Sequence, residues 1–173
     1  KRQEDVYRID QGIERYMTKT QKKTADFMEG CMELGGLLGD WQEDEIIELK
    51  KYGHALGMAF QITDDIMDYR ETAETTGKPV GNDLREGLLT YPLLSIVNDG
   101  NKDKLLEDIK GLNNGGNEQD IIDYVIAQGG IDNTLAVADK YCKDALAALA
   151  AVRDFPGKEF LVMAVENLAD RKV

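Results

Sequence analysis

The feature that most constrains this chain is the stretch FQITDDIMDY at residues 60–69, which places three aspartates inside an apolar run. With the preceding GHALGMA it keeps a helical period, and no glycine or proline interrupts it after Gly57. At roughly 100° per residue, one face of such a helix carries Gln61, Asp64, Asp65 and Asp68. The opposite face carries Ala55, Ala59, Ile62, Ile66 and Tyr69. The pattern predicts a helix that packs into a core and points three carboxylates into a common space.

This arrangement of charges is costly without a partner. Like charges on adjacent helical turns repel each other, and burying them adds a desolvation cost. A hard divalent cation offsets both, because Mg²⁺ takes oxygen ligands and usually combines one or two carboxylates with waters and substrate phosphates. The D-D-x-x-D face is therefore a candidate platform for a metal–diphosphate complex. The competing interpretation is a solvated acidic face on a surface helix.

Composition excludes several classes of partner. The net charge of −12 gives no general basic field, so we expect no binding to nucleic acid. No apolar run reaches the ~18–20 residues of a membrane span. The two cysteines, Cys31 and Cys142, lie in helical patterns and are expected to be free thiols in a reducing compartment, which favours the cytoplasm.

The rest of the chain has the pattern of an all-α protein. It contains three prolines and no run of alternating β-branched residues. The expected helices span residues 13–38, 43–69, 90–97 with Thr90 as the cap, 99–109, 119–127, 131–152 and 158 to the end. Residues 70–87 form a long glycine-containing connection, which we interpret as a lid or binding loop.

Three motifs carry a resemblance to a known family. GMAFQITDDIMDY, followed by TTGKPVGNDLREG and LTYPLL, resembles the second aspartate-rich motif and its loop in the trans-type isoprenyl (polyprenyl) diphosphate synthases. KKTADFMEGCMELGGLLG resembles the Lys-Thr helix of that family, and QGGIDNTLAVADKYCKDALAAL resembles a C-terminal helix. The match covers nearly the whole chain but only the second half of the family's pattern. We therefore expect residues 1–173 to be a single domain, the C-terminal portion of a polyprenyl synthase.

The resemblance implies an all-α helical bundle of the isoprenoid synthase type around a deep central cavity. It implies a prenyltransferase that condenses isopentenyl diphosphate with an allylic diphosphate, uses Mg²⁺ and works as a homodimer, with a heterodimer as the alternative. The implied metal ligands are Asp64, Asp65 and Asp68. The implied substrate-binding residues are Lys23, Thr24, Phe60, Gln61 and Lys78, and the implied catalytic residues are Lys23, Thr24, Gln61, Asp64 and Lys78.

Each of these residues also has a plain structural interpretation. Lys23 lies on an amphipathic pattern and could be an ordinary surface lysine, with Phe27, Met28, Cys31 and Leu34 on the same stripe. Lys78 could be a solvated loop lysine, and Gln61 could bond to a neighbouring helix. The lone histidine, His54, is more often a packed or surface residue than a ligand.

The loop after the aspartates departs from the family pattern at one position. Leu88 stands where the family often has a lysine near the diphosphate, and Arg85 is a candidate to supply that charge. Asp83 either binds a metal-bound water or caps Leu84 and its neighbours.

Two other functions remain open from the sequence. The chain could be a non-catalytic helical subunit of a heteromeric synthase, or a terpene cyclase of the same fold. Consumption of isopentenyl diphosphate separates an elongating enzyme from a cyclase. Product length is set in this family upstream of the first aspartate motif, so the sequence does not give it, and we expect these 173 residues to be inactive alone.

Overall fold

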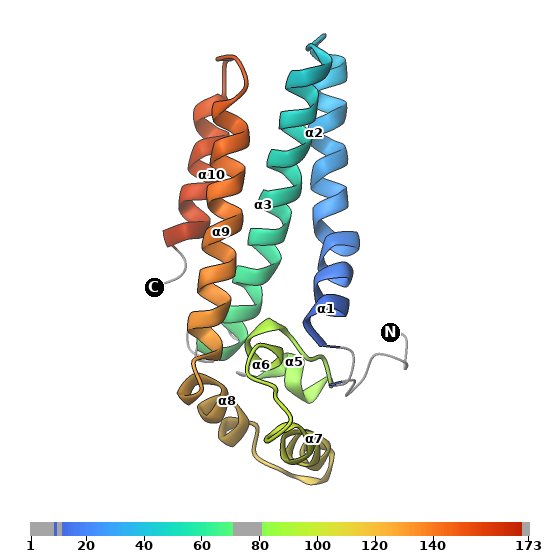
Figure 1. Cartoon of the computed structure of the whole chain (residues 1–173), viewed down its shortest axis with the longest axis vertical. Coiled ribbons are helices and arrows are strands. Elements are labelled where there is room, and N and C mark those ends of the chain that lie inside the picture. The colour runs from blue at the N-terminus through green and yellow to red at the C-terminus, as the bar shows by residue number, and fades with distance from the viewer. Residues whose placement is uncertain (1–8, 10–11, 71–80, 171–173) are drawn as a thin grey trace. The chain divides into compact units, whose positions relative to one another are not determined.

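The computed structural model describes residue 9, residues 12–70 and residues 81–170. In this part of the chain the regular secondary structure is helical, with no strand (Figure 1), which confirms the all-α expectation. The long helices are α1 Gly12–Thr20, α2 Asp26–Leu38, α3 Glu43–Arg70, α7 Lys102–Gly111, α8 Glu118–Ala127, α9 Gly130–Ala150 and α10 Lys158–Asp170. The short elements are the π-helical turn η3 Gln21–Ala25, α5 Asn82–Arg85, α6 Tyr91–Leu94 and the 3-10 turn η4 Leu112–Asn114.

The expected boundaries hold best where the apolar period is long. One difference is that the single helix expected over residues 13–38 is three successive segments, α1, η3 and α2. A second is that α6 ends at Leu94 and α7 begins only at Lys102, because the side chains of Asn98 and Asn101 form a turn between them. Asn101 Oδ1 accepts the backbone N–H of Asn98 at 2.8 Å, and Asn98 Oδ1 accepts that of Gly100 at 2.9 Å. Thr90 stands at the N-cap of α6, but its side chain makes no capping hydrogen bond.

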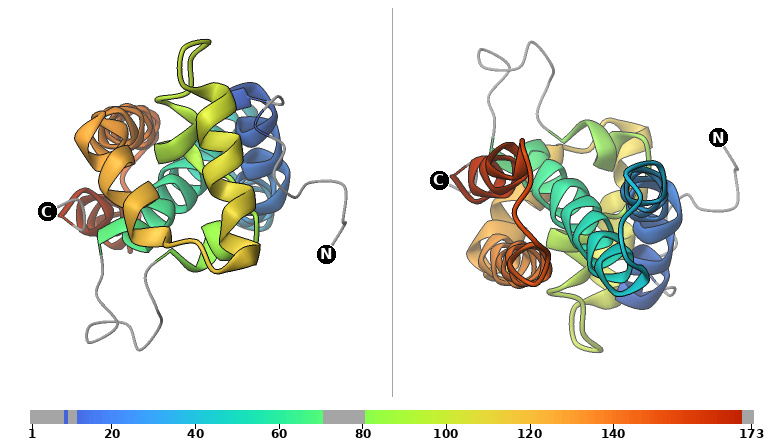
Figure 2. Two further views of the ribbon diagram at one scale, coloured as in Figure 1. Left: turned by 90° about the horizontal axis from the view of Figure 1, so that it is seen from below. Right: turned by 90° about the horizontal axis from the view of Figure 1, so that it is seen from above.

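The helices group into two compact units, which we describe separately. The unit built from Met17–Thr63 and Leu135–Val173 contains η3, α2, most of α3, most of α9, and α10. Figure 2, seen from above, shows α9 and α10 side by side along one flank of α3, with α2 along the other. Its core consists of Leu49, Tyr52, Ala55, Ala59, Cys142, Ala145, Ala148, Leu149, Val152, Val165 and Leu168. Tyr52 Oη donates to the backbone carbonyl of Leu161 at 2.9 Å, which connects α3 to α10.

Two glycines let α3 pack directly on the preceding helical segment. A Cβ at Gly57 would lie 2.6 Å from the Cα of Ala25, and a Cβ at Gly53 would lie 2.7 Å from the backbone oxygen of Met28. Any larger residue at either position would force the helices apart, since real Cβ atoms do not approach backbone so closely. This close packing holds the Lys-Thr segment against α3.

The other unit is built from the described residues of Lys1–Tyr16 and of Asp64–Thr134. It contains the end of α3, the helices α5 to α8 and the first turn of α9 (Figure 1). Its buried residues include Ile66, Leu84, Leu93, Ile109, Ile122 and Val125. The chain returns to α3 at Gly81, which has φ +75° and donates its backbone N–H to the carbonyl of Asp68 at 3.0 Å. Residues with a side chain rarely adopt this φ, which favours glycine here.

No helix in the described ranges is both long enough and apolar enough to cross a membrane. Both cysteines lie in the described ranges, and neither is in a disulfide, as expected; Cys31 is exposed and Cys142 is buried.

Candidate functional site

The three aspartates of the D-D-x-x-D motif occupy three different environments at the end of α3. Asp64 is exposed, Asp68 is half-buried, and Asp65 is only 4% exposed. Asp65 is thus far less accessible than Asp64, and the expectation that it shares a metal site with Asp64 and Asp68 stays a prediction. In this helix, adjacent positions differ by about 100°, which is enough to turn one of two neighbouring aspartates into the interior.

Asp65 is held in the interior by a tyrosine from α1. Tyr16 Oη donates to Asp65 Oδ2 at 2.5 Å, and both side chains are buried. The ring of Tyr16 also packs edge-on against Tyr91, with ring centroids 5.7 Å apart. A buried carboxylate needs such donors, because an unpaired charge in the interior is strongly unfavourable. The sequence did not identify Tyr16 as part of the site.

Asp68 accepts hydrogen bonds from the start of α5. Its two carboxylate oxygens accept the backbone N–H groups of Asn82 and Asp83, each at 3.1 Å. Desolvation by burial raises the pKa of Asp68; the two hydrogen bonds and the charge of Arg85 oppose this shift, and Asp64 adds to it. The pKa stays above its ordinary value, so the ionised form of Asp68 is less stable here than in water. A cation beside it would offset that cost.

The aspartate end of α3 fits a hard divalent cation held by few protein ligands. Asp64 and Asp68 are one helical turn apart and offer only oxygen donors, which Mg²⁺ prefers. The three motif aspartates do not form a group whose ligand atoms all lie within 4.8 Å of one another. The arrangement therefore suits a metal that takes one or two carboxylates and completes its coordination with phosphate oxygens and water.

The Lys-Thr pair lies in the other unit, on the π-helical turn η3. Thr24 Oγ1 donates to Gln61 Oε1 of α3 at 3.1 Å, while Lys23 is exposed. The bond to a neighbouring helical segment that we considered for Gln61 is thus present. Single π turns inside α-helices often occur at functional sites, because the extra residue changes which side chains face a given direction. Phe60, on the same helix as Gln61, is exposed.

The remaining expected site residues belong to the segment that follows α3. Lys78 and the centre of the expected lid lie in residues 71–80, outside the described part of the chain. Leu88 is half-buried, and Arg85 forms an ion pair with Glu118 of α8. Arg85 contributes positive charge near Asp68, since it lowers the pKa of that carboxyl. The two roles considered for the carboxylate of Asp83 both remain predictions.

Comparison with family models and curated proteins gives a consistent result. The chain matches the family described as polyprenyl synthetase over residues 2–128. It is 32% identical over 142 residues to heptaprenyl diphosphate synthase component 2 of Geobacillus stearothermophilus, which covers 82% of this chain and 44% of that protein. It is 34% identical over 153 residues to octaprenyl diphosphate synthase of Escherichia coli, which covers 86% of this chain and 47% of that protein.

Solved structures share the fold. Heptaprenyl diphosphate synthase from Staphylococcus aureus superposes with a TM-score of 0.86 at 28% identity, covering 98% of this chain and 54% of that chain. A polyprenyl synthase from Caulobacter crescentus, complexed with calcium and isoprenyl diphosphate, superposes with a TM-score of 0.84 at 28% identity, covering 98% and 53%. The chain thus spans about half the length of the relatives it matches.

Proposed function

The chain belongs to the polyprenyl synthetase family, and on that premise we propose that it is one half of a metal-dependent prenyltransferase that condenses isopentenyl diphosphate with an allylic diphosphate. The observation that carries the proposal is the aspartate end of α3, where Asp64 is exposed and two backbone N–H groups hold the carboxylate of Asp68. The Caulobacter relative, complexed with calcium and isoprenyl diphosphate, supports both the class of ligand and the use of a divalent cation.

Asp64 and Asp68 are the carboxylates that we assign to Mg²⁺. The ion, when bound, would neutralise negative charge on the diphosphate as it leaves. Asp65, expected from the sequence to be a third ligand, acts in this proposal through its bond to Tyr16, which fixes the end of α3. The two backbone N–H groups that bind Asp68 hold its carboxylate in one orientation, so the site is organised before a ligand arrives.

The residues of the Lys-Thr turn are assigned to the substrate. The ammonium group of Lys23 is exposed and is available to bind diphosphate oxygens, and Lys78 would do the same from the following loop. The bond between Thr24 and Gln61 fixes both side chains, so that their dipoles can stabilise positive charge on the allylic carbon without reorganising. Phe60 is assigned to the apolar wall that contacts the prenyl chain.

The proposal also covers the other half of the fold and the oligomeric state. Relatives are about twice as long as this chain, so we propose that catalysis also needs the half of the fold that these 173 residues do not contain. We propose a cytoplasmic protein that works as a homodimer. A heteromer is the second candidate, because the Geobacillus relative is named as a component of its synthase.

The test measures binding, because the chain alone is not expected to turn over. The purified chain is titrated with inorganic diphosphate in the presence and absence of Mg²⁺ by calorimetry. We expect binding that requires Mg²⁺ and that weakens at least about tenfold in Asp64→Asn. Removing a residue that only hydrogen-bonds to a metal ligand already weakens metal affinity about tenfold, and removing the ligand itself should weaken it at least as much. Asp108→Asn, which changes an exposed carboxylate on α7, is the matched control and should bind as the wild type does. Equal binding by Asp64→Asn and the wild type would refute the metal assignment.

A further inference from the structure

Three side chains of metal-ligand type converge where α2 packs beside α3. Asp26 and Glu29 lie one turn apart on α2, and His54 comes from α3. One ligand atom from each residue lies within 4.8 Å of the other two. His54 Nδ1 is 3.4 Å from Glu29 Oε2, and two ligands held tetrahedrally at usual Zn–N and Zn–O distances are about 3.3–3.6 Å apart. All three residues belong to the same compact unit.

The backbone that carries these ligands is fixed by close packing. Gly53, the neighbour of His54, lies so near α2 that a Cβ would be 2.7 Å from the backbone oxygen of Met28, the neighbour of Glu29. The ligands therefore project from two helices in direct contact. Sites built on packed helices keep their geometry better than sites on loops, which lowers the cost of binding an ion.

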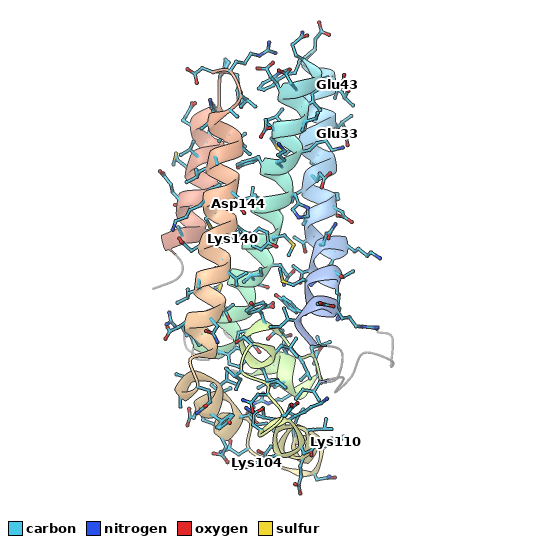
Figure 3. All side chains as sticks on the ribbon, in the orientation of Figure 1. Glu33, Glu43, Lys104, Lys110, Lys140 and Asp144 are labelled. Carbon is cyan, nitrogen blue, oxygen red and sulfur yellow. The ribbon has the colours of Figure 1, made fainter. Side chains whose placement is uncertain are left out.

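The charge around the three residues also favours a dication. Lys50 donates to Glu33 Oε1 at 2.9 Å and lies 3.8 Å from Glu29 Oε1, so Glu33 is its closer partner. Figure 3 labels Glu33 on α2. The three carboxylates of Asp26, Glu29 and Glu33 outnumber the one ammonium group of Lys50, so these four side chains carry two excess negative charges. A divalent ion at Glu29 balances that excess while Lys50 keeps its bond to Glu33.

We propose that Asp26, Glu29 and His54 form a binding site for Zn²⁺ or a similar borderline transition-metal ion. The imidazole nitrogen sets the choice of metal, because nitrogen ligands suit zinc better than magnesium. The D-D-x-x-D motif offers only oxygens, so the two sites take different metals. Three protein ligands leave a fourth position for water or another ligand. An open pocket of about 650 Å³, lined by Glu29, Lys50 and His54, gives access to it.

His54 makes the proposal directly testable, because it is the only histidine in the sequence. A nitrogen-15 NMR spectrum of the whole chain therefore shows one imidazole. On titration with Zn²⁺ we expect the imidazole signals to move and to reach saturation at one equivalent. The same titration with Mg²⁺ should leave them in place. Imidazole signals that do not shift when Zn²⁺ is added would overturn the proposal.

Variants establish whether the carboxylates share the ion. We measure zinc affinity by competition with a chromophoric chelator. Asp26→Asn and Glu29→Gln should each weaken zinc affinity at least about tenfold. Even the loss of a residue that only hydrogen-bonds to a metal ligand typically weakens metal affinity by that factor. Asp64→Asn is the control and should leave it unchanged, which separates this site from the aspartate end of α3. Because Asp26 is exposed, its variant should keep the wild-type circular dichroism and melting curve. Wild-type affinity in Asp26→Asn would show that His54 binds zinc without the proposed site.

Discussion

At the scale of single residues, Tyr52 couples stability to alkaline pH. Its side chain is fully buried, and burial raises the pKa of its phenol from about 10 to about 12. A pKa that is higher in the folded state adds stability that is fully present below the unfolded value and is lost as pH rises through the folded value. The contribution of Tyr52 is therefore complete below about pH 10 and disappears as pH approaches 12.

Tyr52→Phe tests this dependence. Below pH 10 the variant should be less stable than the wild type by about 1 kcal/mol, because it loses the hydrogen bond to Leu161. Between pH 10 and 12 that difference should shrink and then reverse, since only the wild type must keep a phenol protonated in the interior. Urea unfolding of both proteins across this range measures the difference. A difference that is constant with pH would contradict the raised pKa.

Tyr16 should stabilise the aspartate end of α3 through its hydrogen bond to Asp65. Tyr16→Phe removes a donor from the buried carboxylate of Asp65 and should lower the free energy of unfolding by about 1–3 kcal/mol. Adding Asp65→Asn removes the buried charge, so the double variant should be more stable than the sum of the two single effects predicts. Urea denaturation of the four proteins gives the coupling. Additive effects would mean that the two side chains do not depend on each other.

The contact between Tyr16 and Asp65 could not be predicted from the sequence, although the buried face of α3 could. The helical period correctly placed Ala55, Ala59, Ile62 and Ile66 in the interior. It grouped Asp65 with Asp64, because an angle on one helix does not reveal what packs around that helix. Tyr16 is 49 residues away along the chain, and no local pattern connects the two. The approach of His54 to Asp26 and Glu29 was not predicted for the same reason.

At the scale of helices, the contact of α3 with η3 and α2 depends on glycine. In an exposed helix Gly→Ala is usually stabilising by about 1 kcal/mol, from helix propensity. At Gly57 the new Cβ would lie 2.6 Å from the Cα of Ala25, so we expect Gly57→Ala to be destabilising by more than that gain, by about 1–3 kcal/mol. Gly30 on α2 has nothing within 4 Å of a Cβ, and Gly30→Ala should be stabilising. Thermal melts of both variants check the opposite signs; a stabilised Gly57→Ala would disprove the close packing.

The helices themselves were well predicted, and the reason is physical. A long amphipathic period fixes a helix and its buried face, so α3, α8 and α9 appear within two residues of the expected limits. The π turn η3 was not predicted, because a constant α-helical period across residues 13–38 leaves no place for one extra residue in a turn. Its consequence, the bond from Thr24 to Gln61, depends on packing between two segments that the period does not report.

At the scale of the whole molecule, α2 presents a line of exposed apolar side chains. Phe27 is 73% exposed and Leu38 is 79% exposed, with Cys31 and Leu34 between them at helical spacing. Met58 and Ile62 of α3 do not extend this stripe, because both are buried. An exposed apolar stripe of this kind favours association with another surface.

We therefore predict that the chain associates and does not elongate a prenyl chain alone. It offers one aspartate-rich helix and about half the length of its relatives, whereas the reaction that we propose from the family resemblance needs metal held from both sides of the diphosphate and a closed apolar cavity. Light scattering should show a mass above that of one chain, and labelled isopentenyl diphosphate with an allylic primer should give no longer product. Leu38→Lys should reduce the association by placing a charge in the stripe, while Lys104→Leu on α7 is a control of reversed chemistry that should not reduce it. A single chain in solution that elongates the primer would contradict both parts of the prediction, because the cavity and the second set of metal ligands would then have to come from these 173 residues.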